Sequence, residues 1–181
     1  MDILKKYEVA FHGLKEGRHT FEFLVNKEFF ENYTESIISN GSLKVTVSLE
    51  KSSMLLVLDF TIKGEVELPC DRCLDLFMLP LYFKGKLFVK FGETNEELSD
   101  DVLVLNTNEH GLNIAQYIYE NIHLSLPYKR IHPDLPGGES GCNPEMLNKL
   151  NELIIHDTPA EPNDSRWDQL KGLLNNKKTL N

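Results

Sequence analysis

The sequence predicts an α+β fold, in which a mainly antiparallel β-sheet or partly open barrel carries one packed helix and a C-terminal tail of short helices. Three observations predict it. Apolar and polar residues alternate through much of the first two thirds of the chain, one later segment has helical periodicity, and proline and glycine become frequent beyond residue 127. We therefore divide the 181 residues into a β-rich core domain, 1–127, and a Pro/Gly-rich acidic tail, 128–181.

The clearest strand covers residues 43–49, where every second residue is Leu or Val. Asn40-Gly41 marks a turn before it, and the apolar run 54–62 follows after a short polar segment, so a hairpin is expected. Two more strands are expected on either side of a Cys-x-x-Cys turn, at 65–68 and 74–89.

A polar, acidic stretch follows the last of these strands, at residues 92–101, and we expect it to be a loop before the short apolar run 102–105. The helix is expected to begin near Asn113, which with Gln116 resembles a capping box, and to end before Pro127. Its apolar face predicts core packing. In the tail, residues 144–155 and 164–174 have short helical periodicity.

Composition and charge restrict the class of protein. Hydrophobic residues make up 41% of the chain and no apolar run approaches the roughly 18 residues of a spanning helix, so we expect no membrane insertion. The first residues lack the hydrophobic core of a signal peptide, which favours a cytoplasmic location. A net charge of −9 disfavours broad nonspecific binding to nucleic acid.

Cys70, Cys73 and Cys142 form an odd, irregularly spaced set, which favours reduced thiols or a metal site over secreted disulfides. Two cysteines in a tight turn can bind one tetrahedral zinc ion, and Cys142 and His132 are candidates for the other two ligands. Zinc is thus the one candidate cofactor. The alternative is three reduced cysteines without metal. A thioredoxin-like role is a further alternative, although strand patterns rather than a helix flank the motif.

Motifs of catalysis are absent from the sequence. There is no Gly-x-Ser-x-Gly, no Walker loop, no dinucleotide fingerprint and no histidine pair within a helical turn. The six histidines are scattered singly, so we assign no catalytic residue and expect a protein that is not an enzyme.

Two groups of residues are candidates for binding. The only tryptophan lies in the expected terminal helix, whose candidate partner-binding residues are Arg166, Trp167, Leu170 and Lys171. That helix docks either onto the protein's own sheet or onto a partner. The candidate RNA-binding residues are Lys84, Lys86 and Lys90, which alternate along one strand, with Lys129 and Arg130. The alternative is that these are solvated surface charges.

Several segments together resemble the YceD family, whose members are described as large ribosomal RNA subunit accumulation proteins. They are Glu67 to Leu74 around the two cysteines, Leu124-Ser125-Leu126-Pro127, Cys142, and Asp164 to Lys171. Family members often carry a cysteine-rich cluster after the Leu-Pro segment, whereas this chain has only Cys142, with His132 nearby.

The resemblance implies a bacterial, cytoplasmic, non-enzymatic factor for the accumulation or processing of large-subunit ribosomal RNA. Our leading hypothesis is an adaptor that binds a ribosome-assembly or RNA-processing protein and reaches the RNA indirectly. The alternatives are a zinc-stabilised RNA-binding module and a thiol redox protein.

Overall fold

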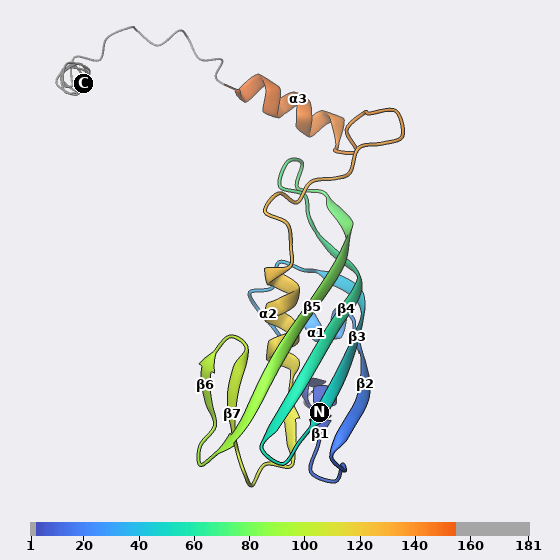
Figure 1. Ribbon diagram of the computed structural model, residues 1–181. Coiled ribbons are helices and arrows are strands. Elements are labelled where there is room, and N and C mark those ends of the chain that lie inside the picture. Colours follow the sequence, from blue (N-terminus) through green and yellow to red (C-terminus); the bar gives the residue numbers. More distant parts are fainter. Residues whose placement is uncertain (1–2, 155–181) are drawn as a thin grey trace, which may run out of the picture. The chain divides into compact units, whose positions relative to one another are not determined.

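The computed structural model describes residues 3–154 and confirms the α+β class (Figure 1). The chain divides into two compact units, Met1–Asn143 and Pro144–Asn181. The first contains the β-sheets. In the second, the described part consists mainly of the amphipathic helix α3, Pro144–Leu153, within the segment for which the sequence predicted a helix. No helix among residues 3–154 is long and apolar enough to cross a membrane.

Six strands form the main sheet, in the order β2-β3-β4-β5-β7-β6, and the sheet is open rather than closed into a barrel. They are β2 (Gly17–Val25), β3 (Asn40–Lys51), β4 (Leu55–Pro69), β5 (Leu76–Gly92), β6 (Glu96–Ser99) and β7 (Val102–Asn106). All neighbours are antiparallel except β5 and β7. The expected β3–β4 hairpin is confirmed, and a second sheet pairs β1 (Glu8–Ala10) with β8 (Gly111–Asn113).

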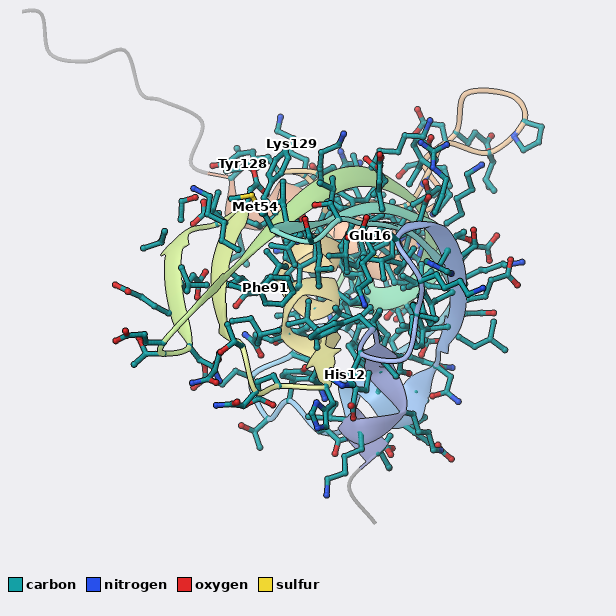
Figure 2. The ribbon with its side chains drawn as sticks, turned by 60° about the horizontal axis from the view of Figure 1, so that its bottom comes forward. His12, Glu16, Met54, Phe91, Tyr128 and Lys129 are labelled. Atoms are coloured by element: carbon teal, nitrogen blue, oxygen red, sulfur yellow. The ribbon has the colours of Figure 1, made fainter. Side chains whose placement is uncertain are left out.

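One face of the main sheet is buried beneath the helices, because the alternate residues of β3 and β4 that face inward are apolar. The helices are the 3-10 helix η1 (Ile3–Tyr7), the short α1 (Lys27–Phe30) and α2 (Ala115–Leu124). The ring of Tyr117 on α2 packs 4.6 Å from that of Phe60 on β4, and the Tyr7 hydroxyl donates to the Leu24 carbonyl oxygen. Figure 2 shows side chains filling the space between the sheet and α2.

The helix α2 begins close to the expected residue, but the predicted capping box is wrong in its second half. The side-chain oxygen of Asn113 accepts a hydrogen bond from the Ala115 amide at 2.9 Å, as a helix-start residue should. The Gln116 side chain instead donates to Glu120, one turn further on.

The prediction of a loop over residues 92–101 is also wrong, because the strand β6 lies within it and pairs with β7. All four residues of β6 are exposed, and two of them are glutamates. A short, charged strand at the edge of a sheet resists pairing with other chains. Its acidic residues lack the alternation of apolar and polar residues that predicts a strand.

Gly64 allows β4 to pass close to its neighbour β3. Its φ of +149° lies where side-chain-bearing residues rarely occur, and an added Cβ would be only 2.0 Å from the Ser42 carbonyl oxygen. Glycine is therefore required at this position of the β3–β4 pair.

Candidate metal centre

The first half of the site is the turn between β4 and β5, where the sequence places Cys70 and Cys73. The Cys70 amide donates to the Asp75 carbonyl oxygen at 2.9 Å, and the Leu74 amide donates to the Cys70 carbonyl oxygen at 2.9 Å. Leu74 takes a left-handed conformation, with φ of 65°, which tightens the turn. The Arg72 amide donates a hydrogen bond to the Cys70 sulfur at 3.4 Å, and such a bond stabilises the thiolate form of a cysteine.

The second half of the site is another tight turn, formed by the segment that follows α2. Asp134 and Ser140 form an antiparallel bridge, and the Leu135 amide donates to the Glu139 carbonyl oxygen at 2.7 Å. In the same antiparallel register, the residue two positions before Asp134 lies opposite the residue two positions after Ser140. These residues are His132 and Cys142. A turn is thus present at the glycine-rich segment 137–141, and each of its two arms carries one of the predicted ligands.

Gly141 is needed because the arms of this turn approach closely. A Cβ on Gly141 would lie 2.4 Å from the carbonyl oxygen of Pro133 on the opposite arm. A side chain there would push the arms apart and separate His132 from Cys142.

The four predicted ligands converge into one cluster. The sulfurs of Cys70, Cys73 and Cys142 and a ring nitrogen of His132 all lie within 4.8 Å of one another. The Cys70 and Cys142 sulfurs are 3.7 Å apart, and the Cys73 sulfur is 3.4 Å from Nδ1 of His132. Tetrahedral zinc with bonds of about 2.3 Å to sulfur would separate two sulfurs by about 3.8 Å. The donor set and its spacing therefore fit a structural zinc ion.

The two turns are joined by contacts outside the ligand set. Asp71 accepts hydrogen bonds from the guanidinium group of Arg130 at 2.9 Å and from the Arg130 amide at 2.8 Å. Arg72 reaches the hydroxyl of Ser140 at 3.4 Å. The two residues inside Cys-x-x-Cys therefore each contact the second turn. Asp71 contacts Arg130, two residues before His132, and Arg72 contacts Ser140, two residues before Cys142.

Two further contacts fix the same arms. The side chain of Asn143, directly after Cys142, donates to the Asp75 carboxylate at 3.1 Å. The His132 ring packs against Phe77 with centroids 4.8 Å apart. Because ligands that are held by outer contacts lose less freedom on binding, these residues prepare the cluster for a metal.

The surroundings of the cluster favour one thiolate. Burial raises the pKa of Cys70, but hydrogen bonds from the amides of Cys73, Arg72 and His132, and from the His132 side chain, outweigh it and lower the pKa to about 6. Burial and the adjacent Cys70 sulfur raise the pKa of Cys73. A negative charge at Cys70 is the form that binds a cation.

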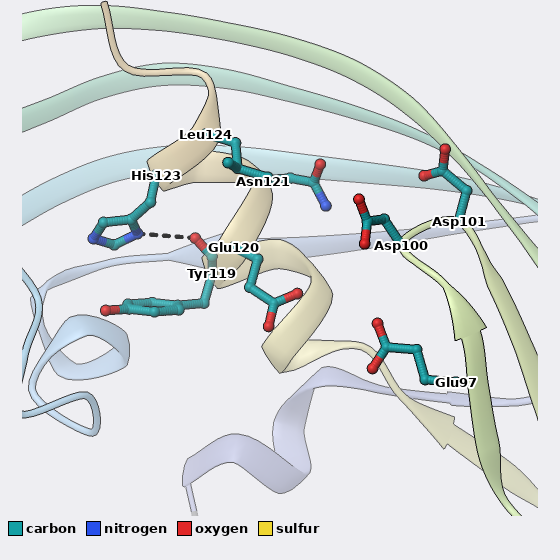
Figure 3. Close-up of a pocket in the computed structure, with 8 residues that line it drawn as sticks. All are labelled: Glu97, Asp100, Asp101, Tyr119, Glu120, Asn121, His123 and Leu124. Atoms are coloured by element: carbon teal, nitrogen blue, oxygen red, sulfur yellow. Dashed lines mark hydrogen bonds between the residues drawn. The ribbon is translucent and has the colours of Figure 1, made fainter. Parts of the chain in front are cut away.

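A cavity of about 510 Å³ lies elsewhere, between α2 and the turn that joins β6 to β7 (Figure 3). Four carboxylates line it, those of Glu97, Asp100, Asp101 and Glu120. His123 also borders the cavity, and its Nδ1 is hydrogen-bonded to the Tyr119 carbonyl oxygen at 2.9 Å. None of the three sulfurs or the His132 ring lines this cavity, so it is separate from the cysteine cluster.

The other candidate residues are spread over the molecule. Lys84, Lys86 and Lys90 lie on one exposed face of β5, where Lys86 forms an ion pair with Asp59 at 3.2 Å. Arg130 is paired with Asp71, whereas Lys129 is exposed on the connecting segment (Figure 2). The structure brings none of these lysines into the cluster. Arg166, Trp167, Leu170 and Lys171 lie outside the described residues.

Asp71, Arg72 and Ser140 have positions beside the site that sequence analysis did not predict. The signal available was that two opposite charges occupy the interior of the Cys-x-x-Cys motif. Their partners at residues 130 and 140 are distant in sequence, and only the folded chain identifies them.

Comparison with known proteins agrees with the resemblance read from the sequence. No curated protein and no solved structure gives a significant match. A family model described as "Large ribosomal RNA subunit accumulation protein YceD" matches residues 58–174, a range that contains all four clustered residues and the only tryptophan. Since this match covers well over half of the sequence, the chain belongs to the YceD family.

Proposed function

We propose that this protein is a non-enzymatic accessory factor for the accumulation of large-subunit ribosomal RNA, acting in the cytoplasm as an adaptor for a ribosome-assembly or RNA-processing protein. The observation that carries the proposal is the family match, which spans both the cysteine cluster and the Trp167 segment. Tryptophan is enriched among the residues that contribute most to binding at protein interfaces. The partner-binding residues proposed are Arg166, Trp167, Leu170 and Lys171.

Within this function the cluster of Cys70, Cys73, His132 and Cys142 acts as a structural zinc site. Bound zinc would supply a four-ligand cross-link between the two turns, and the protein would supply no open position for substrate. The ligand distances support this role, as do the outer contacts of Asp71 and Arg72.

A thiol redox function receives less support from the same geometry. Disulfide exchange needs an attacking sulfur that a second molecule can reach. The exposed fractions of Cys70, Cys73 and Cys142 are 0%, 1% and 3%. The motif also lies between two strands, not at the start of a helix as in thioredoxin-like proteins.

The adaptor role is tested by affinity purification from cells that lack the native gene and express a tagged chain, together with measurement of large-subunit ribosomal RNA. We expect the wild-type chain to recover ribosomal or RNA-processing proteins and to restore the RNA level. W167A should lose both, while W167F keeps the aromatic surface and serves as the matched control. Recovery of the same partners by W167A would contradict the assignment of the adaptor surface.

The metal is tested by elemental analysis of the purified chain and by competition with a chromophoric chelator. One zinc per chain is expected. H132Q should lower the affinity for zinc by at least about tenfold. H19Q changes a half-buried histidine of β2 whose ring is hydrogen-bonded to the Lys15 carbonyl oxygen, outside the cluster, and it should leave the affinity unchanged. Equal zinc content and affinity in all three proteins would remove the zinc assignment.

A further inference from the structure

The face of the main sheet that is turned away from the helices carries an aromatic ring between two lysines. Tyr82 on β5 is 54% exposed. Lys63 lies directly opposite it on β4, with Nζ 5.2 Å from the centre of the ring. Lys84 follows two residues later on the same face of β5, and its Nζ is 5.8 Å from that centre. We call these three residues the Tyr82 patch.

The two lysines of the Tyr82 patch differ from other cations on this face. Lys44 pairs with Glu22 at 2.8 Å, and Lys86 pairs with Asp59 at 3.2 Å. Among the described residues, no carboxylate lies within ion-pair distance of Lys63 or Lys84. Their positive charges are therefore available to an anionic ligand, in a protein whose net charge is negative.

The surface next to the ring is apolar along β5. Pro80 and Met78 precede Tyr82 at alternate positions, so they share its face, and Met78 is 44% exposed. An exposed ring with an apolar continuation accepts flat hydrophobic groups, while the lysines beside it accept negative charge. Nucleic acid bases and phosphates are the ligand groups that combine these two properties, and single strands bind to such surfaces by stacking.

We propose that the Tyr82 patch binds single-stranded RNA, with a base stacked on Tyr82 and adjacent phosphates contacted by Lys63 and Lys84. The inference rests on the proposed function, for which it supplies a direct RNA contact. It also narrows the candidate RNA-binding residues, because Lys86 and Arg130 are already neutralised by Asp59 and Asp71. Acidic protein segments share the negative charge but offer no flat base, so they are the less suitable ligand.

The test is fluorescence anisotropy of the full chain with a labelled, unstructured oligoribonucleotide of about 12 nucleotides, at several salt concentrations. Y82A should weaken binding roughly 5- to 150-fold through loss of stacking, whereas Y82F should stay within about twofold because it keeps the ring. K63Q and K84Q should each reduce the slope of log affinity against log salt by about 0.7, the loss of one phosphate contact.

Two matched controls separate the Tyr82 patch from general electrostatics. The double variant D59N/K86Q removes a neighbouring lysine of β5 while the net charge stays the same, and it should leave the affinity unchanged. K15Q removes one charge in the loop before β2, close to the Gly17–Lys51 pair. Lys51 is seven residues along β3 from Lys44, which lies opposite Lys63 of the patch. That position is about 23 Å from the patch, and K15Q should have less than a twofold effect.

Three results of the RNA-binding measurements would overturn the proposal. These are no measurable binding by a folded wild-type chain, equal binding by wild type and Y82A, or losses in D59N/K86Q as large as those in K63Q. Tight binding of a labelled polyglutamate peptide that depends on Lys63 but not on Tyr82 would assign the surface to an acidic protein and also overturn it. If RNA binding fails while the tagged chain still restores ribosomal RNA accumulation, only this inference falls and the accessory function stands.

Discussion

The protonation of Cys70 depends on the local fold. Its sulfur is fully buried, yet hydrogen bonds from the amides of Cys73, Arg72 and His132 lower its pKa to about 6, against 9.0 for an ordinary thiol. The thiolate is therefore stabilised before any cation arrives. Cys73 has the opposite shift, because burial and the adjacent Cys70 sulfur raise its pKa, so a metal ion would have to displace the proton of Cys73 on binding.

This difference predicts how the stability of the metal-free chain depends on pH. A group whose pKa is lower in the folded state stabilises that state above its unfolded pKa, and this contribution disappears as the pH falls through the folded pKa. In chelator and reductant, the free energy of unfolding should rise between about pH 6 and pH 9. Urea denaturation of wild type and C70S measures it, and equal pH slopes in the two proteins would contradict the shift.

At the scale of elements, the site consists of two turns that are held together mainly by their side chains. The β4–β5 turn and the 134–140 turn are joined by the Asp71–Arg130 ion pair and the contact of Arg72 with Ser140. Because both partners of the ion pair are only partly exposed, it retains more of its strength than a fully solvated pair does.

D71N should therefore weaken zinc binding without removing a ligand. Its amide cannot form the charged contact with Arg130, so the arm that carries His132 becomes less ordered, and we expect a loss of about tenfold in affinity. D59N, which breaks the exposed pair with Lys86, is the matched control and should bind zinc as wild type does. Chelator competition measures the zinc affinity of both variants. Equal affinities would show that the Asp71–Arg130 ion pair is not needed for zinc binding.

G64A should destabilise the sheet through the close approach of β3 and β4. Its Cβ would overlap the Ser42 carbonyl oxygen, and the backbone would keep an unfavourable φ, so a loss of at least about 2 kcal/mol is expected. In G13A the added Cβ meets nothing within 4 Å, and it should stay close to wild type in thermal and urea denaturation. Similar losses in both variants would contradict the proposed steric cause.

Much of this architecture could be predicted from local patterns. The alternation over residues 43–49 predicts β3, and the turn residues around it predict the hairpin with β4. Two cysteines in a tight turn predict half of a metal site, and Cys142, with His132 ten residues before it, supplies the other two candidates, which the fold brings together. Each of these predictions depends on neighbours in sequence or on a very small set of candidates.

The remaining features depend on register and distance along the chain. The parallel pairing of β5 with β7 has no local signal, and β6 is masked by its glutamates. The register of β4 and β5 places Asp59 opposite Lys86. Only this register explains why the charge of Lys86 is neutralised while that of Lys84 is not. In the sequence the three lysines of β5 are equivalent, although their surroundings in the folded protein differ.

For the whole molecule, the cluster connects parts of the chain that are distant in sequence. It joins the hairpin tip of the main sheet to the segment after α2, across separations of 59 and 72 residues. The sheet itself has a core of inward-facing residues on β3, β4 and β5 that does not include the cluster. With zinc bound as proposed, stability would have two components, one from the sheet and one from the metal.

Removal of zinc by a chelator should separate these components. We expect the melting temperature to fall by about 5–10 °C, because a saturated ligand contributes a few kcal/mol to the folded state. Hydrogen exchange should accelerate at the amides of Cys70, Asp71 and Leu74, while amides of the β3–β4 pair stay protected. Uniform loss of protection over both regions would contradict two components.

The wide spacing of the four ligands also has a consequence for biosynthesis. Cys70 and Cys73 leave the translating machinery first, and the fourth ligand follows 72 residues after the first, which at about 5–20 residues per second is a delay of about 4–14 s. During that interval the nascent hairpin carries two open thiols. If zinc fills the site as proposed, its capture would consequently be a late step of maturation, and a newly made chain would join its two turns only when zinc is available at that moment.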